Sequence, residues 1–151
     1  MHNSTIRITK EFKFEMAHAL KGYDGLCRNI HGHSYELLVT IIGHPISDIN
    51  SPKLGMVMDF GDLKSIVNKL IVKPLDHAFV INSETPENYY TSNNQLFGRL
   101  IKVDYQPTCE NMVIDFAEKI KKELPENVEL FSVKLHETAT SFAEWFASDN
   151  K

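Results

Sequence analysis

The sequence has few of the features that mark secreted and membrane proteins. It contains only two cysteines, Cys27 and Cys109, in 151 residues, which is too few for the disulfide framework of a small secreted domain. Its N-terminus has no apolar segment of the kind found in secretory signals, and its longest apolar runs, such as LLVTII, are too short to span a bilayer. We therefore expect a cytoplasmic protein with no membrane partner.

An excess of positive charge is also absent. The chain has 16 Lys and Arg against 20 Asp and Glu, whereas a nucleic-acid-binding domain presents a basic face or stripe. We expect no nucleic-acid partner. A chain of 151 residues, 42% of them hydrophobic, has the usual size and composition of one domain with its own core. We therefore expect a single domain over residues 1–151.

Alternating apolar residues predict two strands in the first third of the chain. The first covers residues 5–18 and the second residues 33–42, and a glycine-containing loop connects them. His18 continues the apolar parity of the first strand to its end, and His31 and His33 extend that of the second strand backwards. A hairpin of these strands would bring the three histidines together at the mouth of the loop.

Two segments with apolar residues at helical spacing follow. The first begins after Asp59, which can cap it, and is expected to end at Pro74. The second begins after Thr108, a candidate N-cap, and ends at Pro125. Glu110 lies in its first turn, where a negative charge suits the helix dipole.

The remaining segments complete a pattern of strands and helices in the order β-β-α-α-β-β. Residues 128–138 and 141–147 predict a hairpin, residues 75–82 a short extended segment, residues 83–98 a long surface loop, and residues 99–106 a short edge strand. We expect an α+β fold with a four-stranded antiparallel sheet and two helices on one face. Such a sheet has two open edges, which predicts oligomerisation.

Three histidines on one face of a hairpin can bind a metal ion. His31 and His33 project from the same face of their strand, about 7 Å apart along the backbone, and His18 ends the neighbouring strand. Three neutral imidazoles suit Zn²⁺ and leave one coordination position open, as catalytic zinc sites do. The pattern H-x-H is also compatible with polar residues at strand ends, so spacing alone leaves both interpretations open.

Cys27 lies in the loop that the hairpin closes. Zn²⁺ and the neighbouring Arg28 would both favour its thiolate, which would make it a reactive group. Cys27 could instead be a fourth zinc ligand in a closed structural site, or an inert buried thiol.

Two further groups carry candidate chemistry. Asp76 and His77 are a carboxylate beside an imidazole, which in a turn can form an acid–base pair, although they could equally be the polar start of a strand. Glu137 occupies the inward parity of an apolar strand, where a carboxylate is costly unless it is paired. It could accept two hydrogen bonds from a flat heterocycle, or form an ion pair with Lys134 or Arg99.

Six short motifs in order give the chain a resemblance to a known family. They are FEMAH, CRNIHGH, VMDFGDLK, LDH, PTCEN and HET, and the resemblance they carry extends from about Phe12 to Trp145. In this set and order the sequence resembles the 6-pyruvoyl-tetrahydropterin synthase / 6-carboxy-tetrahydropterin synthase family. The resemblance implies a tunnelling fold (T-fold) in which subunits form trimeric barrels, and two trimers form a hexamer with active sites at subunit interfaces.

The resemblance also implies a zinc centre and a reactive thiol. His18, His31 and His33 would bind Zn²⁺, and Cys27 would be the general base or proton-shuttling thiolate. Cys109 stands where a serine or alanine is common in the family, which places a second thiol near the site.

The remaining implied roles concern proton transfer and substrate binding. His77, oriented by Asp76, would be the acid–base partner of the thiolate and could come from a different chain. Glu137 would bind the pterin ring through its 2-amino and N3 groups. Thr108 and Glu110 lie in a segment that lines the pterin pocket in relatives.

The implied substrate is 7,8-dihydroneopterin triphosphate, from which zinc lyases of this family make two products. We favour 6-carboxy-5,6,7,8-tetrahydropterin, formed with release of acetaldehyde and triphosphate, as in the bacterial queuosine and deazapurine route. The alternative is the pyruvoyl product, which keeps all three side-chain carbons. Residues 83–106 form a longer insertion than in compact members.

Two hypotheses of other kinds remain at this point. Cys27 could complete a closed site in a non-catalytic, zinc-stabilised module. A metal-free hydrolase using Cys27 and His77 would leave the three converging histidines unexplained.

Overall fold

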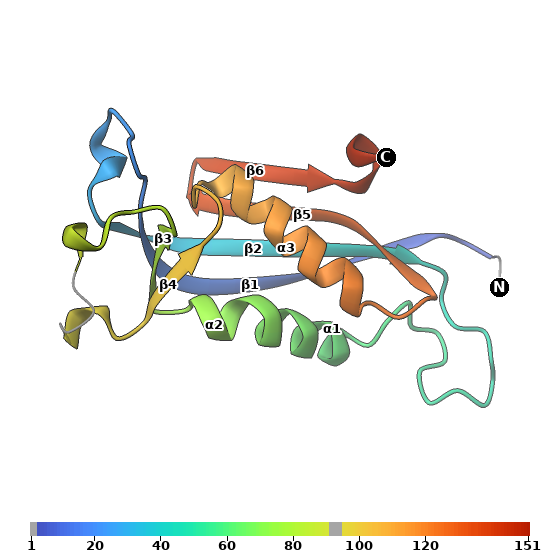
Figure 1. Ribbon diagram of the computed structural model, residues 1–151. Helices are drawn as coiled ribbons and strands as arrows, with labels where there is room; N and C mark the ends of the chain where they lie inside the picture. The colour runs from blue at the N-terminus through green and yellow to red at the C-terminus, as the bar shows by residue number, and fades with distance from the viewer. Residues whose placement is uncertain (1–2, 91–94) are drawn as a thin grey trace.

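Two long strands, β1 (Ile6–Ala19) and β2 (His31–Gly43), form an antiparallel hairpin in the middle of the structure (Figure 1). This computed structural model describes residues 3–90 and 95–151. Successive side chains of each strand alternate between a buried and an exposed face. In this register His18 lies directly opposite His31, and Met16 lies opposite His33. The predicted hairpin is confirmed.

The hairpin belongs to a six-stranded sheet with the order β4-β3-β1-β2-β5-β6. Strands β5 (Val128–Thr138) and β6 (Ser141–Phe146) continue the sheet beyond β2 in antiparallel pairing. On the other side, β3 (Ala78–Asn82) runs parallel to β1, and β4 (Leu100–Val103) runs parallel to β3. The expectation of four strands, all antiparallel, is therefore wrong.

The two additional strands are short and pair with residues that are distant in the sequence. They correspond to the extended segment predicted over residues 75–82 and the edge strand predicted over residues 99–106. Strand β3 follows a helix, and a helical connection is long enough to return the chain parallel to β1. Segments of five and four residues depend on their neighbours in the sheet, which local periodicity does not reveal.

Two helical segments pack on one face of the sheet, as predicted (Figure 1). The first comprises α1 (Phe60–Val67), the π-helical η2 (Asn68–Val72) and α2 (Lys73–Leu75), and the second is α3 (Cys109–Glu123). Asp59 caps α1 by accepting a hydrogen bond from the Gly61 N–H, and Thr108 caps α3 by accepting one from the Asn111 N–H. Across the described ranges, no helix has the length and apolarity that crossing a membrane requires.

Pro74 accounts for the π-helical stretch in the first segment. Proline has no N–H to donate, and its ring clashes with the carbonyl four residues earlier in a regular α-helix. The helix therefore adopts a wider, π-helical turn just before Pro74. In this turn the Lys73 N–H bonds to the Asn68 carbonyl, five residues earlier in the sequence. The helix ends at Leu75, one residue beyond the predicted stop.

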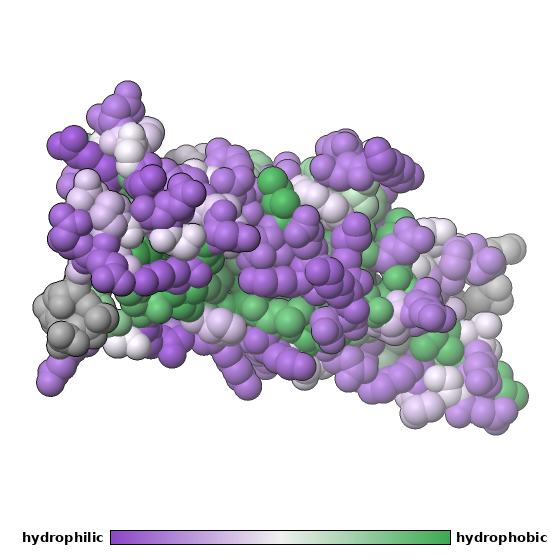
Figure 2. All heavy atoms as spheres, viewed as in Figure 1, coloured by the Kyte–Doolittle hydropathy of each residue, from purple (hydrophilic) through white to green (hydrophobic). Residues whose placement is uncertain are grey.

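The core lies between the sheet and the two helical segments. Its most deeply buried side chains come from β1, β2, β5 and both segments, and include Phe14, Tyr35, Leu37, Ile41, Leu63, Ile71, Met112, Phe116, Ile120 and Leu135. Figure 2 shows that the outward surfaces of the helices are mostly hydrophilic, whereas apolar residues come into view between α3 and α2. His18, with 1% of its surface exposed, is buried at the end of this core.

Two irregular segments lie at the end of the hairpin that carries the histidines (Figure 1). The connection between β1 and β2 contains the short 3₁₀ helix η1 (Leu26–Arg28). The segment after β3 contains η3 (Glu87–Tyr89) and η4 (Gln95–Phe97) before β4 begins. The predicted loop over residues 83–98 is thus partly helical, and its residues 91–94 lie outside the described ranges.

Both edges of the sheet are open within the described chain. Strand β6 forms one edge and the short β4 the other. Strand β3 pairs with β1 only through residues 16–19, so residues 6–15 of β1 have no strand partner on that side among the residues described. Unpaired N–H and C=O groups of this kind favour pairing with another strand.

Candidate active site

The register of β1 and β2 brings three imidazoles together at the end of the hairpin. One ring nitrogen from each of His18, His31 and His33 lies within 4.8 Å of the other two. The Nε2 atoms of His18 and His31 are 2.9 Å apart, and the ring centroids of the three pairs are separated by 4.5, 5.1 and 4.9 Å. Nitrogen donors at this spacing can surround one metal ion.

Hydrogen bonds at Nδ1 of His18 and His31 orient each ring so that its Nε2 atom faces the cluster. His18 Nδ1 is 2.7 Å from the Pro107 carbonyl oxygen, and His31 Nδ1 is 2.8 Å from the Asn29 carbonyl oxygen. Because a carbonyl only accepts hydrogen bonds, each Nδ1 carries the hydrogen. In neutral rings the two Nε2 lone pairs then face each other, which is unfavourable unless a cation lies between them. The donor set therefore fits Zn²⁺, whose histidine ligands donate in this way through their other nitrogen.

Burial favours the neutral form of His18 and His33. Desolvation lowers the pKa of His18 to about 4, despite the opposing hydrogen bond to Pro107, and the neighbouring His31 and His33 lower it further. Desolvation also lowers the pKa of His33, an effect that Glu137 opposes, with its Oε1 atom 3.7 Å from His33 Nε2. Neutral imidazole is the form that binds a metal ion.

A cavity of about 300 Å³ opens beside His18. Four other predicted site residues line it, namely Cys27, Thr108, Glu110 and Glu137. They come from the loop after β1, the start of α3 and the end of β5. The rest of the lining consists of Leu20, Tyr23, Cys109, Ser141, Phe142 and Ala143. Two carboxylates among apolar and aromatic walls suit a flat ligand with hydrogen-bond donors at its edge.

The two thiols at this cavity differ in their surroundings. Cys109 is buried, and its Sγ donates a hydrogen bond to the Leu135 carbonyl oxygen at 3.1 Å. Burial raises the pKa of the Cys109 thiol to about 11, so this thiol stays protonated at neutral pH. Cys27 lies half-buried in η1 at the cavity wall. Since a thiolate is the reactive form of cysteine, Cys27 is better placed than Cys109 to act as a base.

A comparison with known protein families matches almost the whole chain. The model of the family described as 6-pyruvoyl tetrahydropterin synthase covers residues 7–148. The chain belongs to the 6-pyruvoyl tetrahydropterin synthase family. The resemblance drawn from the six sequence motifs is thus confirmed, and the family consists of lyases.

Individual members of the family are similar over nearly their full length. The 6-carboxy-5,6,7,8-tetrahydropterin synthase of Haemophilus influenzae is 40% identical over 141 residues, which cover 92% of this chain and 97% of that protein. The structure of the Caenorhabditis elegans 6-pyruvoyl tetrahydropterin synthase matches with a TM-score of 0.66 and 25% identity, covering 97% and 99% of the two chains. An uncharacterised protein from Wolinella succinogenes shares the fold, with a TM-score of 0.75, 20% identity and coverage of 95% and 99%.

The Asp76–His77 pair forms in a turn before β3, as one of the two sequence interpretations requires. His77 Nδ1 is 3.1 Å from Asp76 Oδ2, while Asp76 Oδ1 accepts a hydrogen bond from the Glu15 N–H at 2.9 Å. His77 has a left-handed backbone with φ of 62°, which breaks the strand alternation and allows the two adjacent side chains to meet. The hydrogen bond from the Glu15 N–H lowers the pKa of Asp76 most, and the nearby His77 ring lowers it further.

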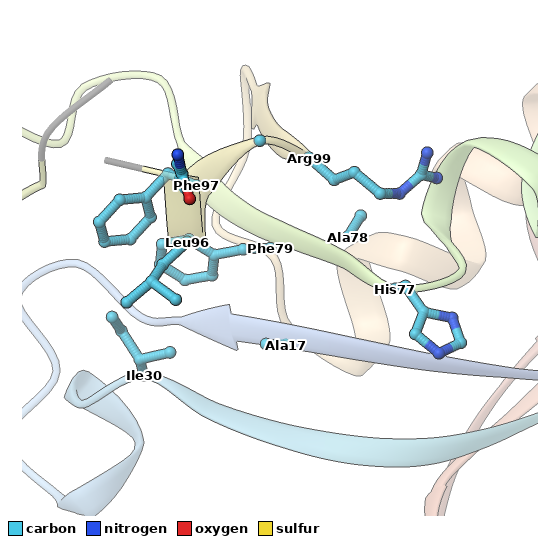
Figure 3. Close-up of a pocket in the computed structure, with 10 residues that line it drawn as sticks. Ala17, Ile30, His77, Ala78, Phe79, Leu96, Phe97 and Arg99 are labelled. Atoms are coloured by element: carbon cyan, nitrogen blue, oxygen red, sulfur yellow. The ribbon is translucent and has the colours of Figure 1, made fainter. Parts of the chain in front are cut away.

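The pair does not line the cavity that contains Cys27. His77 lies at one end of a separate hollow of about 490 Å³. Figure 3 shows Ile30, Leu96, Phe97 and Phe79 gathered at the other end of this hollow. In this family member, therefore, a single chain does not bring the predicted acid–base pair to the cavity of the predicted thiolate.

Tyr35 lies against the histidine cluster, although the sequence analysis did not single it out. Its ring centroid is 5.5 Å from that of His33, and its fully buried hydroxyl has no hydrogen-bond partner among the residues described. Burial, together with nearby Glu137, Cys109 and Cys27, raises the pKa of Tyr35. Tyr35 stands two residues after His33 in the same strand, so alternation alone predicts that the two side chains lie on the same face. Tyr23 and Phe142 also line the cavity, but no periodicity in the sequence pointed to them.

The predicted metal binding by the three histidines can be tested by removing His18, the most deeply buried of them. His18→Ala should weaken zinc binding by more than about 100-fold, because losing even an outer hydrogen-bond partner of a metal ligand costs roughly 10- to 100-fold. His44→Ala, which changes an exposed histidine bonded to the Ser4 carbonyl, should bind zinc like the wild type. Zinc affinity is measured by competition with a chromophoric chelator. Equal affinities of His18→Ala and wild-type protein would contradict the assignment.

Proposed function

We propose that this protein is a zinc-dependent lyase that converts 7,8-dihydroneopterin triphosphate and one water molecule to 6-carboxy-5,6,7,8-tetrahydropterin, with release of acetaldehyde and triphosphate, in queuosine or deazapurine biosynthesis. The observation that carries the proposal is the cavity in which His18, Cys27 and Glu137 meet. The 40% identity to a relative named 6-carboxy-5,6,7,8-tetrahydropterin synthase, over 92% of the chain, supports this product.

Glu137 would hold the pterin ring. Its carboxylate lies at the end of β5, about one quarter exposed, and lines the cavity. A carboxylate accepts two parallel hydrogen bonds, which match the 2-amino and N3 donors at the edge of a pterin. Thr108 and Glu110, at the start of α3, line the same cavity and would complete the pterin site.

Cys27 would move protons at the substrate side chain. Its thiolate would take a proton from a side-chain carbon, while the triphosphate leaves as a separate group. His18, His31 and His33 would hold Zn²⁺ at the mouth of the cavity. When bound there, Zn²⁺ lowers the pKa of coordinated hydroxyl groups and polarises a developing carbonyl.

The Asp76–His77 pair would act from a second copy of the chain. The pair is outside the Cys27 cavity of its own chain, and the described sheet has free strand edges on β6 and on residues 6–15 of β1. Pairing β6 of one copy with residues 6–15 of β1 in the next would close a trimeric barrel and cover both of these free stretches. We propose a hexamer of two such trimers, with each site completed by a neighbouring copy.

Product analysis distinguishes the two possible reactions. The zinc-loaded protein incubated with 7,8-dihydroneopterin triphosphate should release acetaldehyde and triphosphate in equal amounts, together with the carboxy product. Acetaldehyde is trapped as a hydrazone, and the pterins are separated by chromatography. A pyruvoyl product without acetaldehyde would overturn the proposed reaction in favour of the pyruvoyl alternative.

Removing the thiol distinguishes the enzyme from a zinc-stabilised module. Cys27→Ala should keep its zinc and its thermal stability but lose roughly 100- to 10,000-fold in turnover, the usual contribution of a general acid or base. Cys109→Ala, the matched control, should keep most of its turnover, since that thiol stays protonated. Loss of zinc and of stability in Cys27→Ala would instead make Cys27 a structural ligand.

Mixing two inactive variants tests whether neighbouring copies share a site. Oligomers that contain both Cys27→Ala and His77→Ala chains should recover about a quarter of wild-type activity. In a symmetric ring with random mixing, that fraction of the interfaces combines one intact Cys27 with one intact His77. The variants are co-expressed with different tags and purified on both. No recovery would show that the two residues serve the same chain.

A further inference from the structure

A second cavity lies on the other side of the loop that carries Cys27. It has a volume of about 670 Å³ and is formed between residues 19–30 and the segment after β3. Leu20 and Tyr23 line both this cavity and the smaller one that contains Cys27. The Leu20 N–H bonds to the Cys27 carbonyl, which closes the loop between the two cavities. The loop therefore forms a shared wall.

The two cavities differ in charge. The smaller one is lined by Glu110 and Glu137, and no Lys or Arg is found among its described lining residues. It offers no cationic side chain to a triphosphate, whose repulsion from these carboxylates would oppose binding. The larger cavity is lined by Lys21 and Arg28. Arg28 directly follows Cys27 in the sequence, so the larger cavity borders the proposed reaction site.

Arg28 is available to an incoming anion. It lies exposed at the end of η1, and within residues 3–90 and 95–151 no hydrogen bond or ion pair engages its guanidinium. A guanidinium binds phosphate through two parallel hydrogen bonds. Lys21 pairs with Glu84 at 3.7 Å, but both side chains are substantially exposed, so a multiply charged anion can replace this weak pair.

The opposite wall of the larger cavity supplies hydroxyl donors. Thr85, Tyr89 and Tyr90 come from the segment after β3 and line the cavity with Tyr23. Lys102 of β4 lies with its Nζ 5.1 Å from the centroid of the Tyr90 ring, which adds a third positive charge behind this wall. Hydroxyl groups and cations on two facing segments can together bind several phosphate groups of one ligand.

We propose that this cavity binds the triphosphate of the substrate, with Arg28 and Lys21 as its cationic contacts, while the pterin occupies the cavity of Cys27 and Glu137. The assignment rests on the proposed function, since it takes the leaving group from that reaction. It also gives residues 83–90 a role as the wall that selects a triphosphorylated substrate over its dephosphorylated form.

The test measures the binding of two probes to zinc-loaded protein. Inorganic tripolyphosphate represents the leaving group, and 7,8-dihydroneopterin represents the substrate without it; calorimetry gives both affinities, and zinc content is checked afterwards. Arg28→Gln should weaken tripolyphosphate binding roughly 10- to 100-fold, as expected for hydrogen bonds to a charged group. Lys21→Gln should weaken it roughly 10-fold. The affinity for 7,8-dihydroneopterin should stay unchanged in both variants.

Matched variants and turnover separate this inference from the proposed reaction. Lys64→Gln removes an exposed charge on α1 and should leave both affinities and the KM unchanged, whereas Arg28→Lys should retain part of the tripolyphosphate affinity. If the protein turns over 7,8-dihydroneopterin triphosphate and Arg28→Gln and Lys21→Gln leave KM and tripolyphosphate binding unchanged, the subsite is refuted while the function stands. If the protein does not turn over this substrate, weakened tripolyphosphate binding in Arg28→Gln still supports the anion site.

Discussion

The pairing register of β1 and β2 is the constraint on which the site depends. It places His18 opposite His31 and Met16 opposite His33, so that three imidazoles converge from two strands. A slip of one residue would turn every side chain of one strand to the other face. The alternation of Phe12, Phe14 and Met16 prevents that slip, because it would expose the apolar face of β1 to water. The same apolar residues that build the core therefore fix the geometry of the three-histidine cluster.

The buried end of this hairpin is costly unless a cation is bound. His18 is almost fully buried, and the carbonyls of Pro107 and Asn29 fix the orientation of two rings so that their Nε2 atoms face each other. Burial favours the neutral form of His18, the form that binds a metal ion. Folding thus orients the nitrogen donors before any metal ion binds. A metal ion that binds there would not have to spend binding free energy on orienting these rings.

Loops rather than strands decide what surrounds the three-histidine cluster. The connection from β1 to β2 places Cys27 at one cavity and Arg28 at another, and the segment after β3 closes the second cavity from the opposite side. This division lets a sheet position the histidines while loop segments form the walls of both cavities. The Asp76–His77 turn extends the same arrangement, since it presents an ion pair at a surface outside the Cys27 cavity of its own chain.

The sequence by itself determined the central hairpin, both helical segments with their caps at Asp59 and Thr108, and the convergence of His18, His31 and His33. Those features follow from local periodicity and capping chemistry, which neighbouring residues encode directly. Only the tertiary structure decided that β3 and β4 join the sheet in parallel, that Tyr35 lies beneath the histidines, and that Cys109 is buried while Cys27 reaches the cavity. These outcomes depend on contacts between residues far apart in the chain, whose energies arise only once the core has formed.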